Sequence, residues 1–149
     1  MARAYSIDGK DTIAAPQTVV ELRSTTAIRP RIYDVMVGSE ATPADMAAEW
    51  TLARTTTVGS GGSAITPQSL DPDDPAAVAS GREADTTEPS YTANEIMLAF
   101  ALNQRATFRW VAVPGREIVL PAAANGVGLK TVVVNGSGVI CNACIHFEE

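Results

Sequence analysis

The chain has 149 residues, a mass of 15.6 kDa and a formal net charge of −6 from 11 basic and 17 acidic residues. That is the size of one domain, and 46% hydrophobic against 19% charged residues excludes a largely disordered chain. The acidic balance argues against nucleic acid as a partner, because duplex binding needs clustered Lys and Arg. The longest apolar run covers only residues 96–102 and no signal-peptide pattern is visible, so we expect a soluble chain with no membrane partner.

The first sixty residues predict short strands with one helical turn. Residues 1–17 fit two interpretations equally, an N-terminal arm onto a neighbouring subunit or a plain first strand. Thr42 followed by Pro43 is typical of a helix start, so one helical turn is expected between strands. The predicted strands cover residues 18–24, 31–37 and 50–58, and the helical turn covers 43–48.

The middle of the chain is less regular. Residues 59–63, Gly-Ser-Gly-Gly-Ser, predict a loop or bulge where the backbone bends sharply, and no Lys follows them as a phosphate loop would require. A short strand is expected over 65–70. Residues 71–89 carry six acids and one base and predict a long acidic surface loop, with a short helix over 74–79.

The last third predicts strands again. Residues 96–102 fit strand or helix, and the strand is favoured, with Ile96, Leu98, Phe100 and Leu102 on one face. The Pro114-Gly115 turn suggests that a strand over 117–120 turns back and pairs with one over 106–113. With further strands over 129–134 and 139–147, the chain predicts an all-β fold. We expect one domain over 1–149, an antiparallel β-sandwich or jelly-roll of about eight strands with one or two short helical turns.

Cys141 and Cys144 form a C-x-x-C pattern, but they lie in a strand pattern rather than at a helix start. On a strand, a spacing of three places the two thiols on opposite faces, too far apart for a disulfide. We therefore expect one buried thiol and one thiol elsewhere. His146 shares a face with Cys144, yet two ligands do not make a metal site, and a histidine at the surface or an interface is the simpler interpretation.

The remaining candidate chemistry has simpler structural explanations. The acids Asp71, Asp73 and Asp74 suit calcium, but turns and a helix cap account for them. Glu49, Glu95 and Glu117 have no spacing that favours a glycosidase pair over solvated strand faces. We therefore predict no catalytic residues, no cofactor and no metal, and a protein that is not an enzyme.

Two stretches carry a resemblance to a known family. Residues 50–77, and residues 102–117 with their Asn-Gln-Arg and Trp-x-x-x-Pro-Gly-x-Glu elements, resemble small virion proteins of tailed bacteriophages. The resemblance implies a capsid decoration, or cement, protein. Such a protein is a β-sandwich or jelly-roll, usually trimeric, that binds the major capsid protein on the capsid exterior after synthesis in the host cytoplasm.

The acidic, Lys-poor composition fits such a structural role, because binding the assembled shell and not its free subunits stabilises the shell. Charged residues of the N-terminal segment and the acidic loop are the candidate interface with the capsid or a neighbouring copy: Arg3, Lys10, Asp71, Asp73, Asp74, Arg82, Glu83 and Asp85.

Two other functions were compared with this one. A carbohydrate- or receptor-binding β-sandwich of a phage tail or fibre needs exposed aromatic residues, and the patterns around Trp50 and Trp110 suggest burial. A cupin-like jelly-roll enzyme needs several metal-binding histidines, and this chain has one.

Overall fold

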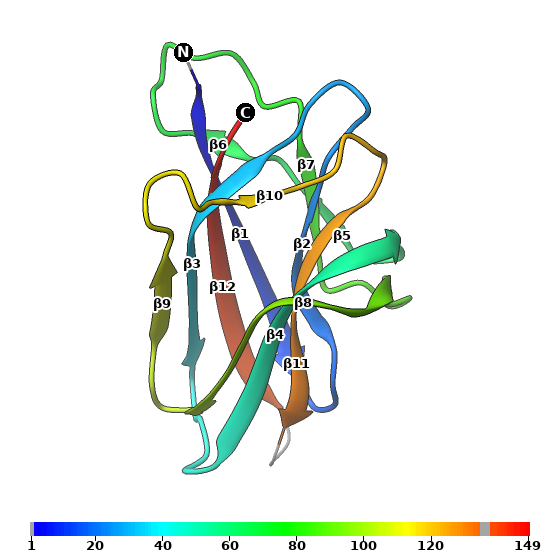
Figure 1. Cartoon of the computed structure of the whole chain (residues 1–149). Coiled ribbons are helices and arrows are strands. Elements are labelled where there is room, and N and C mark those ends of the chain that lie inside the picture. Colours follow the sequence, from blue (N-terminus) through cyan, green and yellow to red (C-terminus); the bar gives the residue numbers. More distant parts are fainter. Residues whose placement is uncertain (1, 135–137) are drawn as a thin grey trace.

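The computed structural model describes residues 2–134 and 138–149 and is a β-sandwich of two antiparallel sheets (Figure 1). Strands make up 61% and helices 0% of the described residues. Within the described ranges there is accordingly no helix of the length and apolarity that a membrane crossing requires.

Each sheet contains six strands. Sheet A has the order β10-β3-β12-β1-β6, with β9 also paired to β3, and sheet B has the order β5-β7-β2-β11-β4-β8. The strands of sheet A are β1 (Ala4–Ile13), β3 (Arg31–Glu40), β6 (Gln68–Ser69), β9 (Phe108–Val111), β10 (Ile118–Val119) and β12 (Val139–Glu148). Those of sheet B are β2 (Thr18–Arg23), β4 (Ala47–Thr57), β5 (Ser63–Ile65), β7 (Ser80–Glu83), β8 (Ser90–Asn103) and β11 (Gly126–Val134).

The strand order is that of a jelly roll. Sheet A contains the series β1-β12-β3-β9 and sheet B the series β2-β11-β4-β8, and successive strands of the chain repeatedly cross from one sheet to the other. The short strands β5, β6 and β7 are inserted between β4 and β8. The prediction of a sandwich or jelly-roll is confirmed, and the additional strands are short.

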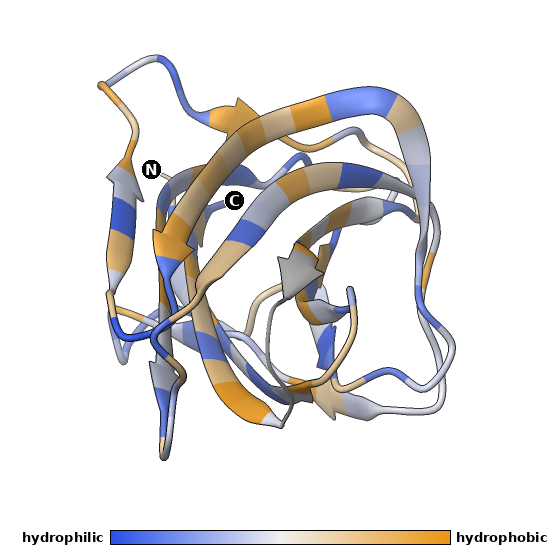
Figure 2. Ribbon diagram, turned by 90° about the horizontal axis from the view of Figure 1, so that it is seen from below, coloured by the Kyte–Doolittle hydropathy of each residue, from blue (hydrophilic) through white to orange (hydrophobic). Residues whose placement is uncertain are grey.

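The core lies between the sheets and follows from the period-two patterning of the strands. Along β12 every second residue is buried, from Val139 through Cys141 to Phe147, as the sequence predicts. The ring of Phe147 stacks on that of Tyr5 at 5.6 Å between centroids. Figure 2 shows the resulting alternation of hydrophobic and hydrophilic residues along the curved strands.

Three local predictions are wrong. Residues 43–48 and 74–79 form no helix, because bends and the start of β4 occupy the first range, and bends and irregular chain occupy the second. Residues 1–17 are not an arm: β1 pairs with β12 from Ala4–Glu148 to Ile13–Val139, inside sheet A. The alternative interpretation, a first strand, is the observed one.

The predicted hairpin at Pro114-Gly115 is also wrong. Both β9 and β10 pair antiparallel with β3, Val111 opposite Asp34 and Ile118 opposite Ile32. The chain leaves β3 after residue 111, makes a loop and returns to the same edge in the same direction. Pro114-Gly115 therefore does lie in a loop, but this loop interrupts an edge strand and does not reverse its direction.

The strand over 96–102 is confirmed as the second half of β8, which ends sheet B. Leu98, Phe100 and Leu102 pack against the core as predicted, but Ile96 is 54% exposed. The register with β4 shifts between Leu98 and Ile96, and this bulge turns Ile96 to the outer face.

Candidate functional site

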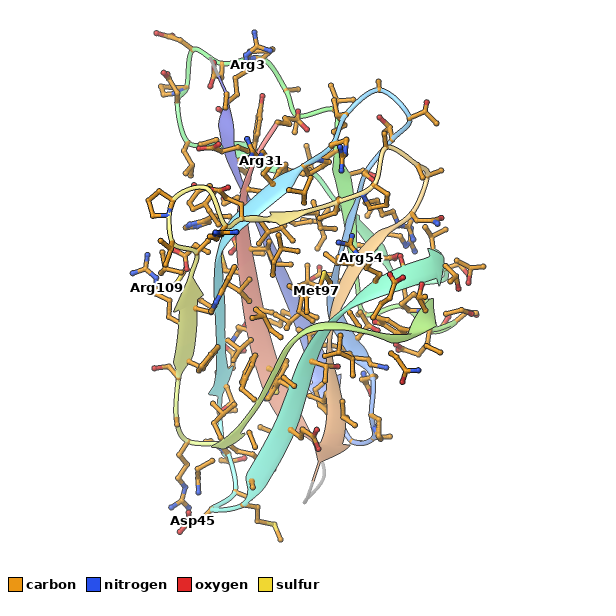
Figure 3. All side chains as sticks on the ribbon, viewed as in Figure 1. Arg3, Arg31, Asp45, Arg54, Met97 and Arg109 are labelled. Atoms are coloured by element: carbon orange, nitrogen blue, oxygen red, sulfur yellow. The ribbon has the colours of Figure 1, made fainter. Side chains whose placement is uncertain are left out.

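The eight residues predicted as an interface do not form one patch. Arg3 lies at the end of the sandwich that carries both chain termini (Figure 3), with its Nε 3.5 Å from Asp74 Oδ1. The Lys10 ammonium contacts the Glu40 carboxylate, and the backbone N–H of Lys10 donates to Glu83 Oε2 at 2.7 Å. These side chains connect segments within the chain, so the structure divides the predicted set among separate internal contacts.

The acidic turn at residues 71–74 has a local explanation. The Asp71 carboxylate accepts the Asp73 N–H at 3.0 Å, and the Asp71 carbonyl accepts the Asp74 N–H at 3.0 Å. Across the described ranges, no group of three or more His, Cys, Asp or Glu side chains is placed to hold a metal ion. The three acids therefore shape a turn.

Arg82 and Asp85 form a nearly buried clamp on residues 59–63, the glycine-rich loop. The Arg82 Nε donates to Asp85 Oδ1 at 2.8 Å, and the two side chains are 18% and 3% exposed. The same carboxylate oxygen accepts the Gly62 N–H at 3.2 Å, while Arg82 Nη2 donates to the Gly62 carbonyl at 3.0 Å. A Cβ at Gly62 would lie 2.2 Å from the Glu83 carbonyl oxygen, so this close approach requires glycine.

A second clamp of the same design holds the other end of this loop. Arg23 donates to Glu21 Oε2 at 2.9 and 3.1 Å and to the Gly59 carbonyl at 2.6 Å, and the Gly59 N–H donates to the same Glu21 oxygen at 3.1 Å. Glu21 is fully buried, and its Oε1 has no hydrogen-bond partner in the part of the chain described. Burial raises the pKa of Glu21, against the lowering effect of Arg23.

Tyr91 covers part of the outer face of sheet B. Its hydroxyl and the Glu88 carboxylate each lie 2.6 Å from Thr18 Oγ1, and Lys130 Nζ sits 3.9 Å from the centre of its ring. Burial raises the pKa of Tyr91. These contacts hold the segment between β7 and β8 against the sheet. The prediction of one long acidic loop over 71–89 is wrong in part, because β7 lies within this range and pairs with β2.

Asp34 is a buried charge that sequence reasoning missed. It is 2% exposed, and Arg109 donates to both of its oxygens at 2.5 to 3.1 Å. His146 Nδ1 lies 3.5 Å from the same carboxylate. Asp34 raises the pKa of Arg109. No local signal marks this group, because β3, β9 and β12 meet only in the folded sheet.

The two cysteines lie as predicted. Cys141 is buried in the core, Cys144 is half-buried on the outer face of sheet A, and both thiols are free. Burial raises the pKa of Cys141 to about 11, and burial together with Asp8 and Asp34 raises that of Cys144 to about 12. Neither thiol is therefore activated as a nucleophile.

Apolar side chains gather on one side of the sandwich, where sheet A ends in β9 and β10 and sheet B ends in β8. We call it the open side. The Phe100 and Phe108 rings stack across it at 3.9 Å, and Trp110 is half-buried beside the core. Val111 and Val113 are 55% and 70% exposed.

The open side does not offer an aromatic platform for sugars. The large hydrophobic residues that are exposed in the described ranges are aliphatic residues and one methionine. Trp50, as predicted, is only 3% exposed, whereas Trp110 is half-buried. The structure therefore gives no observation that favours the carbohydrate-binding alternative.

Comparisons of the chain with protein family models, with curated proteins and with solved structures found no match.

Proposed function

We propose that the chain is a structural virion protein that decorates a phage capsid. It works as a homotrimer on the capsid exterior, bridges neighbouring subunits of the major capsid protein and stabilises the assembled shell. The proposal rests on the resemblance of residues 50–77 and 102–117 to phage virion proteins, and it is compatible with the sandwich fold.

One observation carries the proposal. The Trp-x-x-x-Pro-Gly-x-Glu element at residues 110–117 runs from the end of β9 through the loop to β10, on the open side. Val111 and Val113 stand exposed there, beside the exposed Arg116. Exposed apolar side chains that gather in one patch are typical of a surface that another protein covers. The element that carries the resemblance is thus also the most exposed apolar segment of the described chain.

The two clamps on the glycine-rich loop, which lie away from the open side, fit a structural role. Two ion pairs, Arg82–Asp85 and Arg23–Glu21, fix the glycine-rich loop to sheet B. A body with its loops held in place loses little conformational entropy when it binds a shell. This low entropic cost favours tight binding of many copies to the shell.

The test uses capsid shells of the virus that encodes this chain, prepared without it. Adding the protein should raise the temperature at which the shells break open, because only the assembled shell binds it; at 100 times the Kd, each site gains about 2.7 kcal/mol. Val113→Asp, at a position 70% exposed, should weaken this effect, whereas Val78→Asp, at a position 52% exposed elsewhere on the surface, should not. Light scattering of the free protein should give three times the mass of one chain. Shells that gain no stability from the wild-type protein would overturn the proposal.

A further inference from the structure

We propose that the free edge of β8 receives an extended segment of a capsid subunit, which adds a strand to sheet B and sets an acidic side chain against Arg29 and Arg54. The inference rests on the proposed function and names the contact through which the shell is held. Three observations carry it: the unprotected edge of β8, the protected edge of β10, and the positive hollow between them.

The second half of β8, from Leu98 to Asn103, lacks the usual protection against strand addition, whereas its first half is bulged against β4. Within the described ranges β8 pairs only with β4, and it does so without a shift from Leu98 opposite Leu52 to Asn103 opposite Ala47. Residues 96–102 read Ile-Met-Leu-Ala-Phe-Ala-Leu, with no charge, proline or glycine. Natural edge strands are normally shortened, bulged or marked with lysine or proline to prevent pairing with other chains. A regular, uncharged edge therefore indicates a pairing site.

The facing edge of β10 is already occupied. Arg54 Nη2 donates to the Val119 carbonyl at 3.1 Å, and Arg29 Nε donates to the Leu120 carbonyl at 3.4 Å. Arg54 thus satisfies an acceptor that an added strand would otherwise use, whereas Leu120 faces β3, where its N–H donates to the Pro30 carbonyl. An incoming segment would therefore take its main-chain hydrogen bonds from β8.

The hollow between the two edges has a positive character in an acidic protein. Its volume is about 340 Å³, and it is lined by Arg29, Arg54, Thr92, Glu95 and four further residues. Figure 3 shows the Arg54 side chain between β8 and β10. Arg54 Nε lies 3.4 Å from Glu95 Oε2, and both side chains are partly exposed, so this contact is weak and open to exchange.

Arg29 increases the positive charge of the hollow. It is exposed, and within the described ranges it forms no ion pair, unlike Arg54 and most of the other arginines. Two guanidinium groups facing one carboxylate leave a net positive charge, which a carboxylate of the bound segment would complement. The partner is thus an extended segment, uncharged along β8 and acidic at the end that reaches this hollow.

Variants of the full chain test the edge. Ala99 and Ala101 of β8 are exposed, so Ala99→Lys with Ala101→Lys places two charges beside the free edge without disturbing the core. Binding to the shells described above is measured by co-sedimentation, and this double variant should bind at least tenfold more weakly. Ala14→Lys with Ala15→Lys makes the same change in the exposed turn between β1 and β2 and should bind like the wild type. Unchanged thermal unfolding of both double variants confirms that they fold.

The hollow is tested by changes of opposite sign. Arg29→Glu with Arg54→Glu should weaken binding at least tenfold, and Glu95→Gln, which removes the competing carboxylate, should strengthen it. If the wild type binds shells and the variants at Ala99 and Ala101 bind equally well, this inference is wrong and the proposed function stands. If the wild type fails to bind shells, the proposed function itself fails. If the β8 variants instead abolish self-association of the free protein, a second copy occupies the edge and the inference is overturned.

Discussion

Removing the charge of Arg82 should destabilise the fold strongly, because the Asp85 carboxylate would be left buried without its ion-pair partner. The two side chains are only 18% and 3% exposed, so solvent screens their interaction little. Breaking one partner of a buried ion pair costs about 3–5 kcal/mol. For a chain of this length, each kcal/mol corresponds to about 2–4 °C in Tm, so Arg82→Met should lower Tm by about 10 °C.

Urea unfolding followed by circular dichroism measures this cost directly. Adding Asp85→Asn to Arg82→Met should recover part of the loss, because the introduced amide is neutral and its oxygen still accepts the Gly62 N–H. Arg105→Met is the matched control: Arg105 and Asp45 are 60% and 74% exposed, and breaking such a pair costs less than about 1 kcal/mol. A loss below about 1 kcal/mol for Arg82→Met, or strictly additive losses in the double variant, would refute the reasoning.

Three further predictions concern backbone packing, pH and thiol reactivity. Gly126→Ala should prevent stable folding, because the new Cβ would lie 1.8 Å from the Leu22 carbonyl oxygen. Gly115→Ala is the control: Gly115 has a φ of 81° and open space around it, so this change should cost only about 1 kcal/mol. Urea unfolding measures the stability of both variants. Since burial raises the pKa of Glu21, the folded state loses stability as the pH rises from the unfolded value of 4.5 through the raised value. The stability of Glu21→Gln relative to the wild type, measured by urea unfolding, should therefore increase from about pH 4 to about pH 7, and a flat difference would contradict the shift. Cys141, with its pKa raised from 9.0 to about 11, should react with a disulfide reagent about 100-fold more slowly in the native protein than in the unfolded chain, and equal rates would disprove its burial.

Much of the fold is readable from the sequence because period-two patterning is local. The alternation in residues 139–147 predicted which face of β12 enters the core and placed Cys141 and Cys144 on opposite faces. The helices predicted over 43–48 and 74–79 are absent. A Thr-Pro or Asp-Pro pair suits a tight turn as well as a helix start, and one turn of helix is too short to form without tertiary support.

The sequence identified the residues of the candidate interface as charged, but it did not reveal that they form hydrogen bonds and ion pairs within the chain. Arg82 and Asp85 lie close in sequence, yet their clamp on Gly62 depends on a loop that comes some twenty residues earlier. The Asp34–Arg109 pair joins residues 75 positions apart. Spacing along the chain carries no information on such contacts.

The sequence by itself determined the all-β class, most strand positions, the sandwich and the inward faces, since hydrophobic alternation and turn residues act over a few neighbouring positions. Only the tertiary structure decided which strands are edges. The hydrophobic pattern of residues 96–102 fits a central strand as well as an edge strand. The edge of β8 is free because the chain crosses to sheet A after β8 and continues there as β9. The same folding joins β9 and β10 along β3 and brings Arg29 and Arg54 to one hollow, because strand pairing is set by contacts between residues far apart in the chain.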